Sequence, residues 1–348
     1  MKTIFDKTKI KNLKLKNRLF RSATWEALAD ESGHFDDEIY RIYDELAAGG
    51  VGCIISGFTS VSDNDRYFGG MARLSNDGLI AEHTRLTDIV HRNDIPIIAQ
   101  LALGEYQNKE ISELTDSDIG NIREMFIKAA DRAVLAGYDG IQIHAAHGFF
   151  LSRFISPAHN RSANPEQLII DIAKAVSARH PDLHITIKIN SSDFMYGGLD
   201  ENGSMRICLA CAPYLDSIEV SGNGTSVGGI RPGVNEAYFK RFALPLAENV
   251  DIPVILVGGH RSIDNMNNVL NEGGIEYLSM SRPLIREPDL IDRWQRGERS
   301  PAKCVSCNMC YRTPAHKCIF RLRGDTKRNM RLQSRPLLDS PSEPSELA

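Results

Sequence analysis

Two histidines separated by two residues follow a mostly apolar run in the middle of the chain. The segment reads IQIHAAHG and contains His144 and His147. Imidazoles at this spacing can bind a metal ion, hydrogen-bond an anionic oxygen of a ligand, or cap the helix that follows. A zinc site would need further ligands nearby, and the sequence contains no HExxH pattern to supply them. The pair therefore predicts a polar site at the end of a strand, with its ligand left open.

Four of the seven cysteines lie in one short segment near the C-terminus. In chain order they are Cys304, Cys307, Cys310 and Cys318. Thiolates at this spacing can hold a four-iron, four-sulfur cluster, or zinc, or they can remain free or pair as disulfides. His316 is an alternative to Cys318 as the fourth ligand. The remaining cysteines have apolar neighbours, and we expect inert core thiols at Cys53, Cys208 and Cys211.

Glycine and arginine residues stand at the ends of the last two apolar runs. Gly258 and Gly259 follow VILV, while Ser281 and Arg282 follow LSM. Backbone N–H groups at a glycine turn, a helix N-terminus and one arginine can together hold a phosphate dianion. The alternative is that the glycines only make a tight turn and that Arg282 caps a helix. Both interpretations place these residues just beyond strands.

Eight short runs rich in apolar residues alternate with helical patterns along the chain. The expected strands are Leu19–Thr24, Val51–Gly57, Ile95–Leu101, Gly140–Ala145, His184–Ile189, Ser217–Gly222, Pro253–Gly259 and Tyr277–Arg282. Runs that are apolar throughout, such as IPIIAQL, are typical of parallel strands buried on both faces. Eight such strand–helix units fit an α/β protein with one (β/α)8 TIM barrel. A doubly wound sheet would favour a G-x-G-x-x-G turn after the first strand, and LFRSATWEA contains none.

The two ends of the chain carry different patterns. Residues 4–17 alternate lysine with apolar residues around Asn12, which predicts a hairpin that caps the bottom of the barrel. We assign the barrel to residues 1–298, a cysteine-containing C-terminal extension to 299–320 and a tail to 321–348. The tail begins basic and ends acidic, and we expect it to be partly disordered.

The composition excludes several classes of protein. The 348 residues include 41 Lys and Arg against 45 Asp and Glu, a formal net charge of −4 that argues against a nucleic-acid partner. No run of apolar residues is long enough for a membrane span, and the N-terminus lacks the apolar stretch of a signal peptide. We therefore expect a cytoplasmic protein with a small-molecule substrate and no membrane partner. A homo-oligomer is compatible with the sequence.

Several of these segments together resemble the Old Yellow Enzyme family, the NADH:flavin oxidoreductases. The resemblance spans residues 1–320 and is carried by KNLKLKNRLFRSAT, AQLALGE, GYDGIQIHAAHGFFLSRFISPAHNRS, ITIKIN, VILVGG and YLSMSRPLIREPDL. The third segment is the most specific, because its HxxHG, SRFISP and N-R elements occur together in order. The resemblance implies an enzyme that binds FMN, takes electrons from NADH or NADPH, and transfers hydride to an activated alkene or a related acceptor.

The resemblance also implies which residues contact the flavin. The cofactor-binding set would be Ala23, Thr24, Gly57, Phe58, Gln100, Lys188, Gly258, Gly259, Ser281 and Arg282. Lys188 would be the cation beside N1 and O2 of the flavin, where it stabilises the anionic reduced ring. Ser281 and Arg282, with Gly259, would hold the phosphate. His144 and His147 match the catalytic pair that hydrogen-bonds a carbonyl or nitro oxygen of the substrate.

Several positions of the chain depart from the family pattern, and two of them bear on the chemistry of the expected site. Phe149 stands where many relatives carry the tyrosine that donates a proton, so the donor would have to be Tyr106, Tyr196 or solvent. Glu26 stands where relatives often carry a tyrosine. A carboxylate there could act as a catalytic base or pair with a cationic substrate. The resemblance therefore indicates the FMN site, but these two residues leave the reaction with the substrate undecided.

The cysteine spacing resembles the iron–sulfur segment of the family branch that includes 2,4-dienoyl-CoA reductase and trimethylamine dehydrogenase. The gap before Cys318 is shorter here than in that branch. One alternative function is therefore an FMN amine dehydrogenase or demethylase-type enzyme that passes electrons to a partner. Glu26 and Phe149 favour it. A second alternative, consistent with Phe149, is a flavoprotein without ene-reductase activity.

Overall fold

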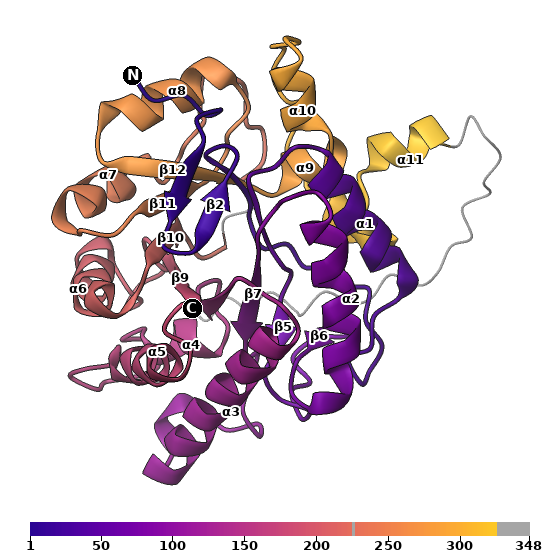
Figure 1. Cartoon of the computed structure of the whole chain (residues 1–348). Coiled ribbons are helices and arrows are strands. Elements are labelled where there is room, and N and C mark those ends of the chain that lie inside the picture. Colours follow the sequence, from indigo (N-terminus) through magenta and orange to yellow (C-terminus); the bar gives the residue numbers. More distant parts are fainter. Residues whose placement is uncertain (225–226, 326–348) are drawn as a thin grey trace.

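Eight parallel strands form a closed barrel in the computed structural model, which describes residues 1–224 and 227–325 (Figure 1). The barrel strands are β3 (Leu19–Arg21), β4 (Cys53–Ile55), β7 (Ile97–Ala102), β8 (Gly140–Ala145), β9 (His184–Asn190), β10 (Ser217–Ser221), β11 (Val254–Val257) and β12 (Ile275–Met280). Each strand pairs in parallel with its neighbours, and β3 pairs with both β12 and β4 while β4 pairs with β7, so the ring closes. The expected TIM barrel is confirmed.

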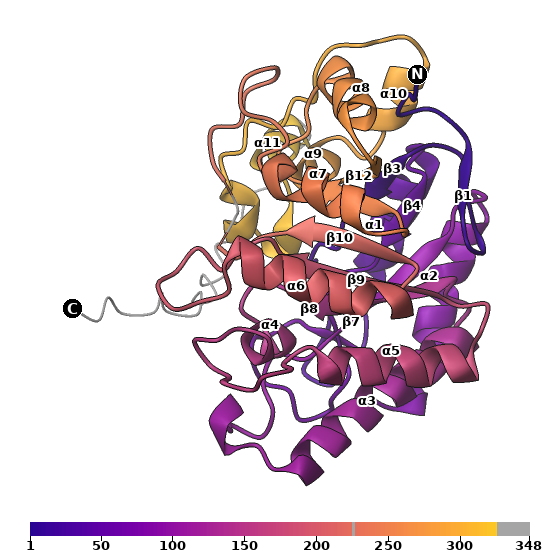
Figure 2. The same cartoon turned by 90° about the vertical axis from the view of Figure 1, so that its left-hand side faces the viewer.

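Helices surround the barrel on its outside (Figures 1 and 2). The longer ones are α1 (Asp37–Ala48), α2 (Ile80–His91), α3 (Asp116–Leu135), α5 (Gln167–Arg179), α6 (Glu201–Cys211), α7 (Lys240–Asn249) and α8 (Ile263–Glu272). Short helices follow at α4 (Phe150–Phe154), α9 (Arg282–Arg286), α10 (Leu290–Gln295) and α11 (Ile319–Asp325). Among the helices of the described ranges, none combines the length and hydrophobicity needed to cross a membrane.

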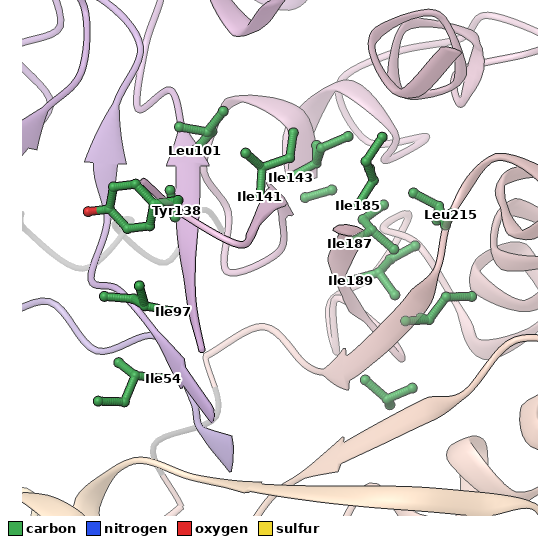
Figure 3. Close-up of a cluster of buried hydrophobic side chains, with 14 of the residues drawn as sticks. Ile54, Ile97, Leu101, Tyr138, Ile141, Ile143, Ile185, Ile187, Ile189 and Leu215 are labelled. Carbon is green, nitrogen blue, oxygen red and sulfur yellow. The ribbon is translucent and has the colours of Figure 1, made fainter. Parts of the chain in front are cut away.

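The interface between strands and helices is built from branched apolar side chains. Ile141 and Ile143 of β8 share one cluster with Ile185, Ile187 and Ile189 of β9, and the cluster extends to residues of α3 and α5 (Figure 3). Successive side chains of a strand point to opposite faces. The residues between these isoleucines therefore face the inside of the barrel, and on these two strands they are polar.

The N-terminal hairpin closes the bottom of the barrel as expected. It pairs β1 (Thr8–Ile10) with β2 (Leu13–Leu15) through a turn in which Lys11 adopts a φ of +47°. Ile10, Leu13 and Leu15 pack on the lower interior of the barrel, where Phe20 and other strand residues complete an apolar cluster. Burying these side chains stabilises the closure by about 1.5–3 kcal/mol for each fully buried aliphatic residue.

Two short strands were not expected from the sequence. The strands β5 (Thr59–Ser60) and β6 (Ala72–Arg73) extend the sheet beyond the upper end of β7. Each is only two residues long, so no alternation pattern can identify it. Together they shape the long connection between β4 and α2 on the same side of the barrel as the expected site.

The C-terminal extension runs back against the barrel after α10. It consists of the turns η4 (Met309–Arg312) and η5 (Pro314–His316) and the helix α11. Ser306 and Asn308 have positive φ angles of +54° and +58°, so the backbone is tightly folded here. The expected basic-then-acidic tail lies, from residue 326 onward, outside the described residues.

Candidate functional site

Polar side chains of four neighbouring strands, β7 to β10, meet inside the upper half of the barrel. The strand register places His144 beside Lys188, and Lys188 beside Glu219. One layer below, Gln100 lies beside Gln142. All five side chains are buried. Because parallel strands hold their residues in fixed layers, this arrangement is set by the backbone ladder.

Lys188 forms an ion pair with Glu219 that neither sequence motif nor family resemblance had indicated. The two atoms Nζ and Oε2 are 3.1 Å apart, and Lys188 Nζ also donates to Ser22 Oγ at 2.7 Å. Glu219 is fully buried and accepts hydrogen bonds from Ser22, Ser279 and Gln142 at 2.6–2.8 Å. Burial raises the pKa of Glu219, but Lys188 and the three hydrogen-bond donors outweigh it and leave the pKa below its ordinary value. The carboxylate is therefore ionised.

Gln100 is expected beside the flavin, and the structure ties it to the same network. Its Nε2 donates to Gln142 Oε1 at 2.9 Å, and Gln142 Nε2 in turn donates to Glu219. The sequence contained a signal for Gln142 and Glu219: each stands between apolar residues of a strand, at the alternate positions that also carry His144 and Ser221. Interpreting the strands around Gln142 and Glu219 as apolar throughout overlooks these alternating polar positions.

The two expected histidines lie together at the end of β8. Their ring centroids are 5.2 Å apart. His147 has a φ of +65°, its N–H donates to Asn190 Oδ1, and its Nε2 lies 2.8 Å from Ser221 Oγ. Burial, assisted by Lys188, lowers the pKa of His147 to about 3. Both rings are therefore neutral near pH 7, because burial and the neighbouring His147 also lower the pKa of His144.

His144 carries an unsatisfied polar atom. Its Nδ1 is buried and has no hydrogen-bond partner among the described residues. Buried polar atoms without a partner are uncommon and often belong to a binding site. The position of this nitrogen among aromatic rings is consistent with a ligand group.

An aromatic cluster covers the histidines. Phe149 lies 5.1 Å from His144 and 4.9 Å from Phe58 between ring centroids. Phe68 contacts Phe58 and also Trp25, the latter at 4.5 Å. These rings come from the loops after β3, β4 and β8, so the cluster joins three strand ends. An apolar enclosure of this kind excludes water and suits a planar or hydrophobic ligand.

The two tyrosines expected as proton donors lie in very different environments. Tyr106 is 3% exposed and belongs to the main core, whereas Tyr196 is fully exposed in the loop after β9. Sequence reasoning overlooked a third tyrosine: the half-buried ring of Tyr67 lies 5.4 Å from that of Phe149. The Tyr67 ring packs directly against Phe149, the position at which many relatives have a tyrosine.

Glu26 lies beneath the loop that follows β4. Its carboxylate is 3.7 Å from the Arg21 guanidinium and accepts a hydrogen bond of 3.4 Å from the Tyr43 hydroxyl. A Cβ atom on Gly57 would lie 2.2 Å from Glu26 Oε2, so glycine is required for this close approach. Burial raises the pKa of Glu26 to about 7, although Arg21 opposes the shift. Glu26 is thus a group that titrates near neutral pH.

The expected flavin contacts on β3 and in the loop after β4 lie at the same end of the barrel. Thr24 Oγ1 is 2.8 Å from Ser281 Oγ and also contacts the Arg21 guanidinium. Ala23 packs against the interior apolar cluster. Phe58 belongs to the aromatic cluster described above. The structure therefore links the ends of the first and last strands directly.

The expected phosphate residues lie after β11 and β12. Gly258 and Gly259 have φ angles of +122° and +80°, conformations that favour glycine, and their faces lie against the Tyr238 ring. Ser281 precedes α9. The Arg282 guanidinium donates to the Val227 carbonyl at 2.9 Å and contacts Asn308 of the C-terminal extension. The glycine turn and the arginine are brought together, and the arginine also bridges to the cysteine segment.

All four cysteines of the extension line one cavity. Arg282, Ile285 and Phe320 line it as well. Within residues 1–224 and 227–325, no three His, Cys, Asp or Glu side chains meet closely enough to share one metal ion. His316, the alternative ligand, packs its ring 4.6 Å from Trp25. The segment therefore places its four thiols around the cavity, and through His316 it contacts Trp25 of the aromatic cluster.

Arg261 anchors this segment to the barrel. It is 1% exposed, and its Nε donates to the Cys304 carbonyl at 3.0 Å while its Nη2 donates to Ser306 Oγ at 2.6 Å. The same guanidinium contacts Cys304 Sγ at 3.7 Å. The three other cysteines are buried in the barrel and in α6, as expected for core thiols.

A closed (β/α)8 barrel with a buried lysine, two histidines and a glycine turn at one end is typical of barrels that bind a phosphorylated cofactor. Comparison with known proteins makes this class more specific. The sequence profile of the NADH:flavin oxidoreductase / NADH oxidase family matches residues 3–111 and 102–167 of this chain. The resemblance found in the sequence is thereby confirmed.

Individual relatives are distant. A metal reductase of Desulforamulus reducens is 26% identical over 88% of this chain, and the chain spans 51% of its length. A 4,4'-dithiodibutanoate disulfide reductase of Rhodococcus erythropolis is 25% identical, with 92% and 95% of the two chains covered. The solved structure of histamine dehydrogenase from Rhizobium sp. 4-9 superposes with a TM-score of 0.78 at 21% identity, over 89% of this chain and 50% of that one. The chain thus spans about half the length of two of these proteins.

Proposed function

We propose that this chain binds FMN at the open end of its barrel, is reduced by NADH or NADPH, and transfers hydride to an activated alkene or related small-molecule acceptor. The observation that carries the proposal is the meeting of Lys188 and His144 in one buried layer, with the His147 ring 5.2 Å from that of His144 and with His144 Nδ1 lacking a partner among the described residues. The match to the NADH:flavin oxidoreductase / NADH oxidase profile supports the same cofactor and the same reductant.

The residues at this end of the barrel fit FMN. The groups that would hold it are Ala23, Thr24, Gly57, Phe58, Gln100, Lys188, Gly258, Gly259, Ser281 and Arg282. Gly258 and Gly259 have positive φ angles that favour glycine, and their turn packs closely against the Tyr238 ring, where a side chain would collide. When bound, FMN would supply the ring that accepts a hydride from the reductant and gives it to the acceptor.

Lys188 would place positive charge beside the pyrimidine edge of the ring. A fixed cation in a buried site stabilises negative charge more strongly than the same cation would in water. Gln100 would hydrogen-bond this edge from the neighbouring layer. Both side chains are held by partners on adjacent strands, so little reorganisation is needed when charge develops.

His144 and His147 would bind the oxygen of the acceptor. As neutral imidazoles they donate one N–H each, and a donated hydrogen bond polarises a carbonyl or nitro group. Because the pKa of His147 is about 3, this ring is not a proton source near pH 7. Ser221 and Asn190 orient it through its side chain and its backbone.

Another group must supply the proton that completes alkene reduction. Phe149 has no acidic hydrogen, and we assign this role to Tyr67, whose ring contacts Phe149. Tyr67→Phe should slow the step in which an alkene reoxidises the enzyme by about a hundredfold, in the range of general-acid effects. Reduction by NADH should not change. An equal loss in both half-reactions would remove Tyr67 from this role.

The test of the whole proposal is spectroscopic. The purified chain supplied with FMN should show flavin absorbance that NADH or NADPH bleaches and that an enone restores. His144→Ala should lower the rate of restoration by about 10²–10³, because it removes one oxygen-binding donor. His91→Ala is the matched control, since His91 pairs with Asp139 on the barrel exterior. A chain that takes up no FMN would contradict the proposal.

Oxidation of an amine is the second candidate function. The aromatic cluster of Trp25, Phe58, Phe68 and Phe149 could enclose a cationic substrate by cation–π contact. Glu26, a base with a pKa of about 7, and the likeness to histamine dehydrogenase favour it. Bleaching of the flavin by a methylated amine instead of NADH would support this function. Failure of both substrates would favour a flavoprotein without ene-reductase activity.

We also propose that the cysteine segment holds a four-iron, four-sulfur cluster through Cys304, Cys307, Cys310 and Cys318. A single tetrahedral zinc would bring its thiolates to about 3.8 Å from one another, given zinc–sulfur bonds of about 2.3 Å. A cube spreads its ligands further apart, which suits four thiols around a cavity. Iron, sulfide and zinc analysis of protein purified without oxygen tests this; zinc without iron would contradict it.

A further inference from the structure

Glu219 is surrounded only by hydrogen-bond donors. Its Oε1 accepts from Ser22 and Ser279, and its Oε2 accepts from Gln142 and faces the Lys188 ammonium. A carboxylate has acceptor capacity on both oxygens, whereas a glutamine has one acceptor oxygen and one donor nitrogen. The site is therefore built for an ionised glutamate and not merely for a polar side chain.

Lys188 is tied to that carboxylate twice. Its Nζ contacts Glu219 directly at 3.1 Å, and it also reaches Glu219 through Ser22, which accepts from Lys188 and donates to Oε1. The exposed fractions of the two side chains are 3% and 0%. Water therefore screens this pair very little, and each charge strongly affects its surroundings.

The pairing changes the charge that a flavin would experience. An isolated buried ammonium would favour the anionic reduced ring and raise the reduction potential. With a carboxylate beside it, the net charge of the pair is zero, and what remains is the dipole of an ion pair. The two other ionisable side chains next to this pair, His144 in the same layer and His147 in the turn after β8, are neutral near pH 7 and do not add to it.

We propose that Glu219 is an internal counterion of Lys188 that limits the positive charge presented to the flavin and so keeps the reduction potential of the bound FMN low. Glu219 is a positioning residue in this proposal, because it acts through Lys188 and the serine bridge. The proposal rests on the proposed binding of FMN. A low potential favours the reduced enzyme as a hydride donor to the acceptor.

The experiment measures the reduction potential of FMN bound to the full chain against a reference dye. Glu219→Gln should shift the equilibrium with the dye at least tenfold toward reduced flavin, which corresponds to about 30 mV for a two-electron couple. Affinity for sulfite, a probe of positive charge near the pyrimidine edge, should rise as well. Glu219→Ala is the second neutral variant, because it avoids placing a new amide donor against Gln142 and Lys188.

Two further variants separate charge from structure. Ser279→Ala removes one hydrogen bond to Glu219 and keeps its charge, so the dye equilibrium should change less than about threefold. Lys188→Met/Glu219→Gln removes both charges, and its potential should fall below that of Glu219→Gln. An equal potential in these two variants would show that Glu219 does not act through Lys188.

Outcomes for the two proposals differ. If the wild-type chain binds FMN and both neutral variants keep its potential, the counterion role is overturned while FMN binding stands. If the wild-type chain binds no FMN, both proposals fail. A raised potential in Glu219→Gln or Glu219→Ala, with little change in Ser279→Ala, would support the counterion role.

Discussion

The barrel interior and the cysteine extension position their reactive groups in opposite ways. Lys188 and Glu219 lie on adjacent strands, in register, with each charged atom satisfied by neighbours on the barrel wall. The cysteines lie on short turns with positive φ angles, and Arg261 connects those turns to the barrel. The first site is fixed by the backbone ladder, whereas the second depends on side-chain contacts and on what its cavity holds.

This difference has an energetic consequence. A residue of the barrel site cannot be changed without leaving a buried charge or donor unpaired, so its loss affects the whole fold. A residue of the extension can be changed with a local effect, because regions with few buried contacts open without global unfolding. Function and stability should therefore be coupled in the first region and separable in the second.

The largest expected effect is that of Lys188→Met. Removing the ammonium leaves Glu219 buried without its counterion, which costs about 3–5 kcal/mol of unfolding free energy. Urea denaturation measures the change. The matched control is Lys240→Met, whose half-exposed pair with Glu272 should contribute less than about 1 kcal/mol. Equal losses in the two variants would contradict a special role of the buried layer.

Glu26, which belongs to the barrel region, should make the free energy of unfolding depend on pH. Its pKa of about 7 in the folded chain exceeds the ordinary value of 4.5, so between these values the folded state binds a proton that the unfolded state releases. Stability from this group is therefore highest below pH 4.5 and falls, by a total on the order of 3 kcal/mol, as pH rises to 7.

Denaturation of the wild type and of Glu26→Gln at pH 5 and pH 7.5 isolates that contribution. The difference between the two proteins should shift in favour of the glutamine variant at the higher pH, because glutamine has no charge to bury. A difference that is constant with pH would show that the Glu26 carboxyl titrates at its ordinary value.

Arg261→Lys should loosen the extension without opening the barrel. Lysine cannot reach the Cys304 carbonyl and the Ser306 hydroxyl together, and the loss of these hydrogen bonds costs about 1–3 kcal/mol. Hydrogen exchange should rise at residues 304–312 and stay unchanged in β8–β10. Arg241→Lys, at an exposed pair with Glu201, is the control. Faster exchange in the barrel strands would contradict the separation of the two regions.

The smallest effect on stability is expected for Cys307→Ser. Cys307 is exposed, so the free energy of unfolding of the barrel should change by less than about 0.5 kcal/mol, while the iron expected in the proposed cluster should decrease. Cys208→Ser should show the reverse pattern, because it places a hydroxyl in the core at a buried position of α6. Unchanged iron content in Cys307→Ser would remove this thiol from the cluster.

The sequence predicted the barrel well because hydrophobic periodicity reflects burial. All eight expected strands exist; for example, Gly140–Ala145 matches β8 without any shift in its bounds. Other expected strands extended past their observed ends, as at Val51–Gly57, where only Cys53–Ile55 forms β4. Glycine and polar residues at such ends continue the extended pattern in the sequence although their backbone has left the ladder.

The site was less predictable because its partners come from distant segments. His144 and Lys188 could be identified by their motifs, whereas the contact of Lys188 with Glu219 depends on which strands are neighbours. The anchoring of Cys304 by Arg261 joins positions 43 residues apart, and no local pattern reveals it. Glu26 illustrates the same limit: its residue type suggested chemistry, but only the fold reveals its contact with Tyr43.

The N-terminal hairpin restricts the access of substrates to the polar layer. Its apolar side chains block the lower end of the barrel. Ligands would therefore reach the polar layer from the upper end, between the loops that follow the strands. The nicotinamide donor and the acceptor would then use the same opening and would have to bind one after the other. Removing the first 17 residues would expose the apolar strand side chains that cluster with the hairpin, such as Phe20, to water at the lower end of the barrel.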